Sequence, residues 1–405
     1  MKRALAELAL LLSAALGLRI AGAWTLGEGA PFGPDGTGAE AAVHLGGHLY
    51  PLHISLIGLV GDGRTLSIIA GTLTCGLLWL YGRRLGLGSA GGWLAVALPL
   101  AVYPSCLTAG DAPALLLVVA GATLATLGRG AAVVGGALAL AAVAVKPVVL
   151  PALVLLLPTP LAFVGVALGL PAALRWLKPL VDPKVDGGML GTWWQAGGGQ
   201  PPASAGELGA QLLGGLKALI AAPLWALVPL ALIAILGAAW PWAARREAAE
   251  PSPLVRTSAL ASLVGLLAVA TLFGDRLAPR YLMAPVVALL PWAGAALPRW
   301  SASVLLIPTA ALLTQVAAYR AQADPTARVP KLPVMPHPPV AAGPLFDESS
   351  TEDATALRAQ ATELARSLPA GATVTVERRP HGREGELVWP LRVARPDINF
   401  EVVAP

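Results

Sequence analysis

Charged residues are scarce in this 405-residue sequence, and they are spread unevenly along it. They make up 13% of the chain, whereas soluble domains carry about 25%. Residues 1–319 hold 12 acidic and 18 basic residues, while the much shorter segment 320–405 holds 11 and 10. Such a distribution excludes a single soluble fold. It predicts lipid as the solvent for residues 1–319 and water for the tail.

Cysteine is also rare, and long basic runs are missing. Two cysteines, Cys75 and Cys106, cannot build a disulfide framework or a zinc finger, and both lie in apolar segments as small core residues would. The net charge of +5 contains no run of five basic residues, so we expect no nucleic-acid partner. The positive excess lies in residues 1–319, as the positive-inside rule predicts for a membrane protein.

Long apolar runs, in contrast, are abundant. A helix needs about 20 apolar residues to cross the hydrocarbon core of a bilayer. The sequence therefore predicts an all-α polytopic membrane protein with about eleven transmembrane helices, in contact with membrane lipid. The candidate spans are 4–25, 64–82, 88–106, 112–128, 131–145, 147–158, 160–177, 211–242, 254–273, 281–297 and 301–319.

Two of these spans are short and meet at Lys146-Pro147, so they form either a hairpin or one kinked helix. The hairpin is favoured because it places the basic clusters on the cytoplasmic side. These clusters are Lys2, Arg3, Arg83, Arg84, Arg129, Arg245, Arg246, Arg256 and Arg299. The N-terminus is then cytoplasmic in the inner (plasma) membrane, and the loops 26–63 and 178–210 and the C-terminal tail are not. The N-terminal segment resembles a signal peptide, but Arg19 inside it favours an uncleaved helix.

The tail has its own organisation. Residues 320–346 are rich in proline and predict an extended, semi-rigid linker. Residues 347–405 predict a small soluble α+β domain, with a helix near 351–368, a strand at 373–376 and a second strand through 386–393. We find no catalytic motif in this domain.

The loop 26–63 carries acids and histidines but no Lys or Arg. Its acids either are simply solvated or include a catalytic carboxylate, for which Asp35 in a Pro/Gly-rich turn is the candidate. His44 and His48 are spaced i, i+4 and share a face if the segment is helical, so a divalent metal ion is one alternative. The other is contact with the interface or a substrate. The sequence requires no cofactor, and we assign no metal ligands.

Asp111 begins an apolar span on the same predicted side as this loop. A helix-start aspartate favours the positive end of the dipole, which alone explains its presence. Three cations, Lys146, Arg276 and Arg280, reach the same side. They either snorkel to the membrane edge or, together with the carboxylates, hold a lipid-linked phosphate.

The order of these motifs resembles the GT-C membrane glycosyltransferases, including the protein-mannosyltransferase and aminoarabinose-transferase types, over roughly residues 1–300. The matching segments are Pro34-Asp35, His48-Leu49-Tyr50-Pro51-Leu52, Arg64-Thr65-Leu66, Leu80-Tyr81-Gly82-Arg83-Arg84-Leu85, Tyr103-Pro104, Asp111-Ala112-Pro113, Lys146-Pro147 and Arg280-Tyr281-Leu282-Met283-Ala284-Pro285. The sequence departs from the family in its acids. The acidic pair that follows the first span is reduced to Asp35 and a distant Glu40, and Asp111 stands where Glu is common.

This resemblance implies inverting transfer of a sugar from a polyprenyl-phosphate donor to an acceptor on the non-cytoplasmic face. Asp35 would be the general base, and Asp111 would orient the donor or a cation. The acceptor and the sugar are not indicated. The residues implied to bind the substrate are Arg280, Lys146, Tyr281, His53, Glu40 and Arg276.

Two other functions fit the same chain. A transporter or flippase for a lipid-linked substrate would show inverted repeats and charges at mid-membrane, and we find no internal repeat. A GT-C-like scaffold that has lost activity and serves assembly would show a thinned acidic motif. The reduced acidic pair is the feature that favours this last alternative.

Overall fold

The protein is described here from a computed structural model, in which almost every element is a helix. The structure describes residues 2–26, 52, 56, 59–60, 63–102, 104–106, 110–181, 204–220, 253–273, 282–297, 301–307, 309–310, 360–361, 363–377, 387, 391, 395 and 397–403. The α-helices are α1 Lys2–Leu26, α4 Gly63–Arg84, α5 Ala90–Ala97, α6 Pro99–Val102, α7 Asp111–Ala125, α8 Arg129–Val145, α9 Ala162–Val181, α11 Ala205–Ile220, α13 Pro253–Phe273 and α14 Met283–Ala296. Two 3-10 helices, η1 Pro104–Cys106 and η2 Pro147–Leu156, interrupt this series.

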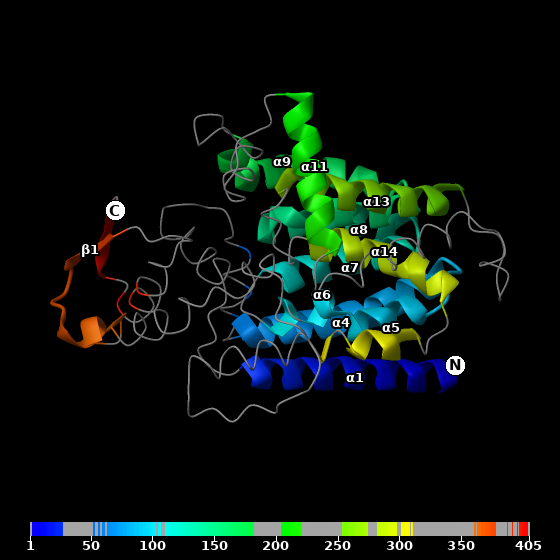
Figure 1. Ribbon diagram of the computed structural model, residues 1–405, viewed down its shortest axis with the longest axis horizontal. Helices are drawn as coiled ribbons and strands as arrows, with labels where there is room; N and C mark the ends of the chain where they lie inside the picture. The colour runs from blue at the N-terminus through cyan, green and yellow to red at the C-terminus, as the bar shows by residue number, and fades with distance from the viewer. Residues whose placement is uncertain are drawn as a thin grey trace.

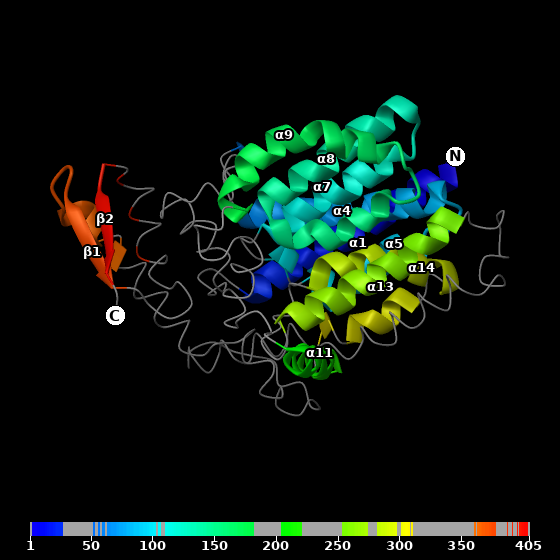
Figure 2. The same ribbon diagram turned by 90° about the horizontal axis from the view of Figure 1, so that it is seen from above.

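The long helices run alongside one another and form one bundle (Figures 1 and 2). Within the described residues, α1 and α4 are long and apolar enough by themselves to cross a membrane, and the other apolar helices are shorter. Large apolar side chains on the outer side of α1 are exposed, among them Leu10, Ile20 and Trp24. A surface of this kind suits lipid, where helices are favoured because they pair all their backbone groups internally.

Glycines let neighbouring helices approach closely. A Cβ on Gly91 of α5 would lie 2.8 Å from the carbonyl oxygen of Leu290 in α14. Gly121 of α7 and Gly135 of α8 likewise face each other's backbone, with no room for a side chain. Small residues at helix contacts are typical of membrane bundles, in which close van der Waals packing takes over from the hydrophobic effect.

The chain reverses at Lys146-Pro147, as the hairpin interpretation predicted. The Tyr81 hydroxyl, near the end of α4, donates to the carbonyl oxygen of Leu155 at 2.6 Å. Lys146 itself contacts Asp111 at the start of α7, which packs on α4. The segment η2 therefore returns along the bundle from the end reached by α8. A 3-10 helix rises about 2 Å per residue, so its ten residues cover more length than ten residues of α-helix.

The predicted span 88–106 is not one continuous helix. Helix α5 ends before Leu98, whose backbone is extended, and α6 begins at Pro99. Farther along the chain, α6 ends at Val102 and η1 begins at Pro104. Proline has no backbone N–H and clashes with the preceding turn, so Pro99 cannot continue α5.

Helix α11 lies across the other helices and packs on α13 (Figures 1 and 2). The sequence predicted a span over 211–242, but this helix begins at Ala205, inside the predicted external loop 178–210. Because α11 crosses the direction of the other helices, it is not part of a span that runs parallel to them. The rest of that prediction, residues 221–242, lies outside the described residues.

The N-terminal end of α1 is tied to the C-terminal end of α4. Glu7 accepts hydrogen bonds from the Ser89 hydroxyl at 2.9 Å and from the Trp93 indole at 3.3 Å. Its other oxygen lies 3.9 Å from the guanidinium of Arg83, which stacks over the Trp79 ring. The basic residues at these two helix ends thus share one end of the bundle, as the charge pattern predicted.

The C-terminal residues form a small α+β unit. Strand β1 Thr373–Glu377 pairs in parallel with β2 Asn399–Val403. The second strand was predicted at 386–393, and that prediction is wrong. Leu387 and Leu391 are helical, four residues apart, and belong to the buried core of this unit. Parallel strands need a crossover connection, and Leu387 and Leu391 lie in the chain between the two strands.

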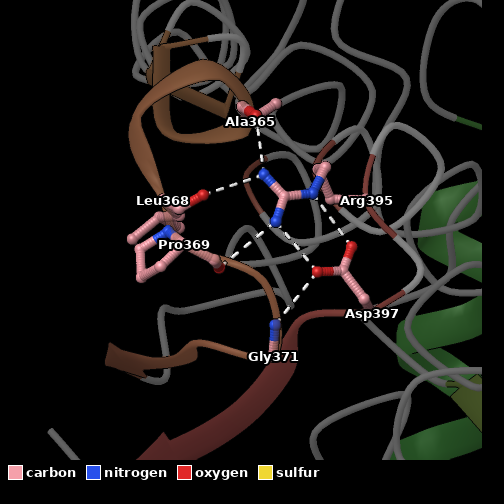
Figure 3. A network of polar contacts seen from close by, with 6 residues as sticks. All are labelled: Ala365, Leu368, Pro369, Gly371, Arg395 and Asp397. Carbon is pink, nitrogen blue, oxygen red and sulfur yellow. Dashed lines mark hydrogen bonds and ion pairs between the residues drawn. The ribbon is translucent and has the colours of Figure 1, made fainter.

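Arg395 holds this unit together (Figure 3). Its guanidinium donates to the carbonyl oxygens of Ala365, Leu368 and Pro369, which end a helix, and in two bonds to Asp397. All five N–H groups of the arginine are therefore used. Asp397 also accepts from the backbone N–H of Gly371, and these bonds hold the pKa of its carboxyl well below the usual range.

Candidate functional site

Asp111 stands at the point where the broken third span turns into α7. It is the first residue of that helix and follows Gly110. The side chain is almost fully buried, at 2% exposure. A carboxylate in this position is favoured by the positive end of the helix dipole, which contributes about 0.3–1 kcal/mol and up to about 2 kcal/mol when partly buried.

Lys146 occupies the corresponding position where α8 ends. Its backbone is extended, and Pro147 directly after it cannot continue the α-helix. Its own N–H still donates to the carbonyl oxygen of Ala142 at 2.9 Å, so the helix is hydrogen-bonded up to the turn. The reversal of the chain therefore fixes where this lysine stands, next to the start of α7.

Asp111 and Lys146 form a buried ion pair. The lysine Nζ donates to the aspartate Oδ2 at 2.6 Å, and the side chains are 8% and 2% exposed. The residues are 35 positions apart in the chain. Burying a charge away from bulk water costs free energy of desolvation. Each of these two buried charges is tolerated because the opposite charge of its partner compensates it.

The pair has a defined chemical capacity. An ammonium can bind a phosphate oxygen, and a carboxylate can hold that ammonium in place. Because the charges of Asp111 and Lys146 cancel, the pair alone does not attract an anion. A phosphate bound here needs further positive charge, and the sequence predicts that charge from Arg280 and Arg276.

The structure thus brings together two of the predicted site residues, Asp111 and Lys146, and it gives Asp111 a partner that spacing alone did not name. The other predicted site residues lie outside the described part of the chain and remain predictions. They are Asp35, Glu40, His53, Arg276, Arg280 and Tyr281. In the described residues no group of three or more His, Cys, Asp or Glu side chains gathers in a way that would hold a metal ion.

Arg19 is a residue whose importance the sequence analysis missed. It is 1% exposed in the interior of the bundle, on α1. The signal was visible, since an ionisable residue inside an apolar span is costly and often functional. From the sequence alone, Arg19 indicates only that the first helix is not cleaved, because residue spacing does not show what a guanidinium contacts.

Comparison with known proteins shows which solved structure has a similar fold. No protein-family model and no curated protein sequence matches the chain. The structure is similar to the crystal structure of ArnT from Cupriavidus metallidurans bound to undecaprenyl phosphate, with a TM-score of 0.53 and 15% sequence identity. The match covers 95% of this chain and 84% of ArnT. ArnT is an aminoarabinose transferase of the GT-C type, so the all-α fold of this chain is similar to that of a GT-C membrane protein.

Proposed function

We propose that the protein is a membrane glycosyltransferase that uses a polyprenyl-phosphate-linked sugar donor. The observation that carries this proposal is the buried Asp111–Lys146 pair at the turns between helices, within a fold similar to that of ArnT. The ArnT structure holds undecaprenyl phosphate, the class of lipid that such a donor leaves behind. Membrane embedding suits this substrate, because the polyprenyl tail stays in lipid while the phosphate and sugar reach the membrane edge.

The reaction transfers the sugar from the lipid-linked donor to the acceptor. The acceptor hydroxyl attacks the anomeric carbon of the sugar as its proton passes to the carboxylate of Asp35. The bond between that carbon and the phosphate oxygen breaks, and the polyprenyl phosphate leaves with the electron pair. Attack on the face opposite the leaving group inverts the configuration at the anomeric carbon.

Positively charged side chains stabilise the leaving phosphate. The leaving phosphate is a weak base and needs no general acid, but its negative charge must be stabilised as the bond breaks. Lys146 supplies one cation, with Arg280 and Arg276 as the others, and Asp111 keeps Lys146 in position. Glu40, His53 and Tyr281 bind the sugar or the acceptor.

A transfer assay with the purified full-length protein tests the proposal. The protein is placed in lipid vesicles with a polyprenyl-phosphate sugar labelled in the sugar, and release of polyprenyl phosphate is measured together with labelled acceptor. We expect both products from the wild-type protein and severely reduced amounts from Lys146→Met. Arg129→Met, which removes an exposed cation at the start of α8, is the matched control and should retain activity.

The assay also separates the alternatives. Movement of the intact donor across the vesicle membrane without cleavage would indicate a transporter. Neither transfer nor binding of polyprenyl phosphate, over a broad set of sugars and acceptors, would indicate a scaffold. Either result would overturn the proposal.

A further inference from the structure

Arg19 is a cation enclosed by the bundle. Its guanidinium donates to the carbonyl oxygens of Ala15, Ala95 and Ala101 at 3.2–3.4 Å and to the sulfur of Cys75 at 3.4 Å. Among the residues that the structure describes, no carboxylate forms an ion pair with it. A buried charge without a counter-ion is costly, so its hydrogen bonds to dipoles must offset a large desolvation penalty.

Two of the carbonyls that it binds, those of Ala95 and Ala101, lie on the two sides of a helix break. In a continuous helix the N–H of residue 99 would donate to the carbonyl oxygen of Ala95, but residue 99 is Pro99 and has no N–H. Arg19 fills that vacancy. On the other side, Ala101 accepts from Arg19 and from the Ser105 hydroxyl.

Further contacts complete this arrangement. The carbonyl oxygen of Ala97, also at the break, accepts from the hydroxyl of Thr309 at 2.5 Å. The Cys106 thiol donates to the backbone oxygen of Arg19 at 3.4 Å. Non-helical backbone at membrane depth is tolerated only where its polar groups are paired inside the protein. Arg19 thus satisfies the break at Pro99 and contacts the end of η1.

The segment held in this way leads directly to Asp111. Cys106, the last residue of η1, is five positions before the aspartate. Gly71 of α4 provides the space, because a Cβ there would lie 2.7 Å from Nε of Arg19 and 2.6 Å from Cβ of Ser105. The guanidinium therefore links α1, α4 and the broken span at one place.

We propose that Arg19 is a positioning residue of the active site. It pins the broken span so that Asp111 meets Lys146 and holds that lysine for the donor phosphate. The kinetic part of this inference rests on the proposed transferase function, while the structural part does not. Loss of the guanidinium leaves the Ala95 carbonyl without this donor, removes one of the donors to the Ala101 carbonyl, and loosens the path to Asp111.

The structural part is tested by thiol reactivity in the full-length protein in detergent. In a Cys75→Ser background, Cys106 is the only thiol, and it is fully buried in the fold. We expect Arg19→Met and Gly71→Ala to speed its reaction with a maleimide by about tenfold or more, since bonds to a charged group are lost or displaced. Arg19→Lys should be intermediate, because a point charge cannot reach all the acceptors of a guanidinium. Gly17→Ala, on the same helix with nothing near its added methyl group, should match the parent.

A second reporter separates local loosening from unfolding. Ser262→Cys on α13, in a background with both native cysteines replaced, places a thiol at another fully buried position. Arg19→Lys and Gly71→Ala should leave this thiol slow to react. If Arg19→Met exposes both thiols equally, Arg19→Lys and Gly71→Ala decide the question. The proposal is overturned if the reactivity of Cys106 is unchanged in these two variants, or if they expose both thiols equally.

Kinetics then distinguish positioning from a merely structural role. With a lipid-linked donor, Arg19→Lys and Gly71→Ala should raise the KM for the donor about tenfold, and kcat should change less, because misplacement weakens the hold on the phosphate. Unchanged kinetic constants per folded molecule, together with an exposed Cys106, would show a role in structure alone and overturn the positioning claim. If the wild-type protein transfers no sugar, the proposed function fails and takes the catalytic claim with it. The thiol measurements still decide whether Arg19 holds the break.

Discussion

Removing one charge of the Asp111–Lys146 pair should cost more than removing both. At 2.6 Å and an effective dielectric constant of about 20, Coulomb's law gives an attraction of about 6 kcal/mol. Desolvation of each ion consumes several kcal/mol of it, so the pair adds little net stability. Lys146→Met, however, removes the ammonium that compensates the buried carboxylate of Asp111, and we expect a loss of about 3–5 kcal/mol. Asp111→Asn removes the carboxylate that compensates the ammonium and should cost a similar amount.

The double variant tests this reasoning. Asp111→Asn combined with Lys146→Met removes both charges, so its free energy of unfolding should return to within about 1–2 kcal/mol of the wild type. The assay is denaturant or thermal unfolding in detergent, followed by tryptophan fluorescence. Arg129→Met is the surface control and should change stability by about 0.5 kcal/mol or less. If each single variant loses less than about 1 kcal/mol, or if the two losses simply add, the pair is not a buried, coupled unit.

Asp35→Asn should reduce the rate of transfer by about 10²–10⁴-fold and change donor binding little, and Glu40→Gln should have a milder effect on the rate. Kinetics that show full activity for Asp35→Asn and none for Glu40→Gln would mean that Asp35 is not the base. Treatment with EDTA should leave transfer unchanged, because side chains supply the positive charge, and a loss restored by a divalent ion would place a metal in the site. Hydrogen bonds from Arg395 and Gly371 lower the pKa of Asp397 in the folded protein. The stabilisation that these bonds give to the C-terminal unit is therefore fully present above the unfolded-state pKa of about 3.9. It is lost as the pH falls through the lower pKa of the folded state. Cleavage of the tail by an acid protease should therefore rise on acidification in the wild type, and Asp397→Asn should be cleaved readily even near pH 5; equal cleavage of the two proteins throughout would contradict the pH dependence.

The sequence predicted the elements whose signals are local. The apolar runs of α1 and α4 lie as expected, and the Lys146-Pro147 turn is a hairpin because a proline follows a short apolar helix there. The break at Pro99 was missed, since a proline inside a long apolar run is often accommodated as a kink. In the structure, Arg19 donates to the Ala95 carbonyl oxygen that the break leaves without a backbone partner, and 76 residues separate the two in the sequence.

The candidate site was predicted in part. Charge placement put Asp111 and Lys146 on one side of the membrane, and the structure joins them directly. The direct pairing itself depends on the packing of α7 against α8 and η2, which no local pattern encodes. In the tail, the prediction of a strand through 386–393 overlooked the four-residue spacing of Leu387 and Leu391, which is typical of a helix.

A structure of the protein with polyprenyl phosphate in a lipid nanodisc would show whether the Asp111–Lys146 pair forms part of the donor site. We expect the phosphate within hydrogen-bonding distance of Lys146, with Arg280 on its other side and the loop 26–63 facing it. The Asp111–Lys146 contact should persist or lengthen as the phosphate shares the ammonium. A phosphate bound elsewhere, with Lys146 still enclosed and Arg280 remote from it, would contradict the assignment of this pair to the donor site.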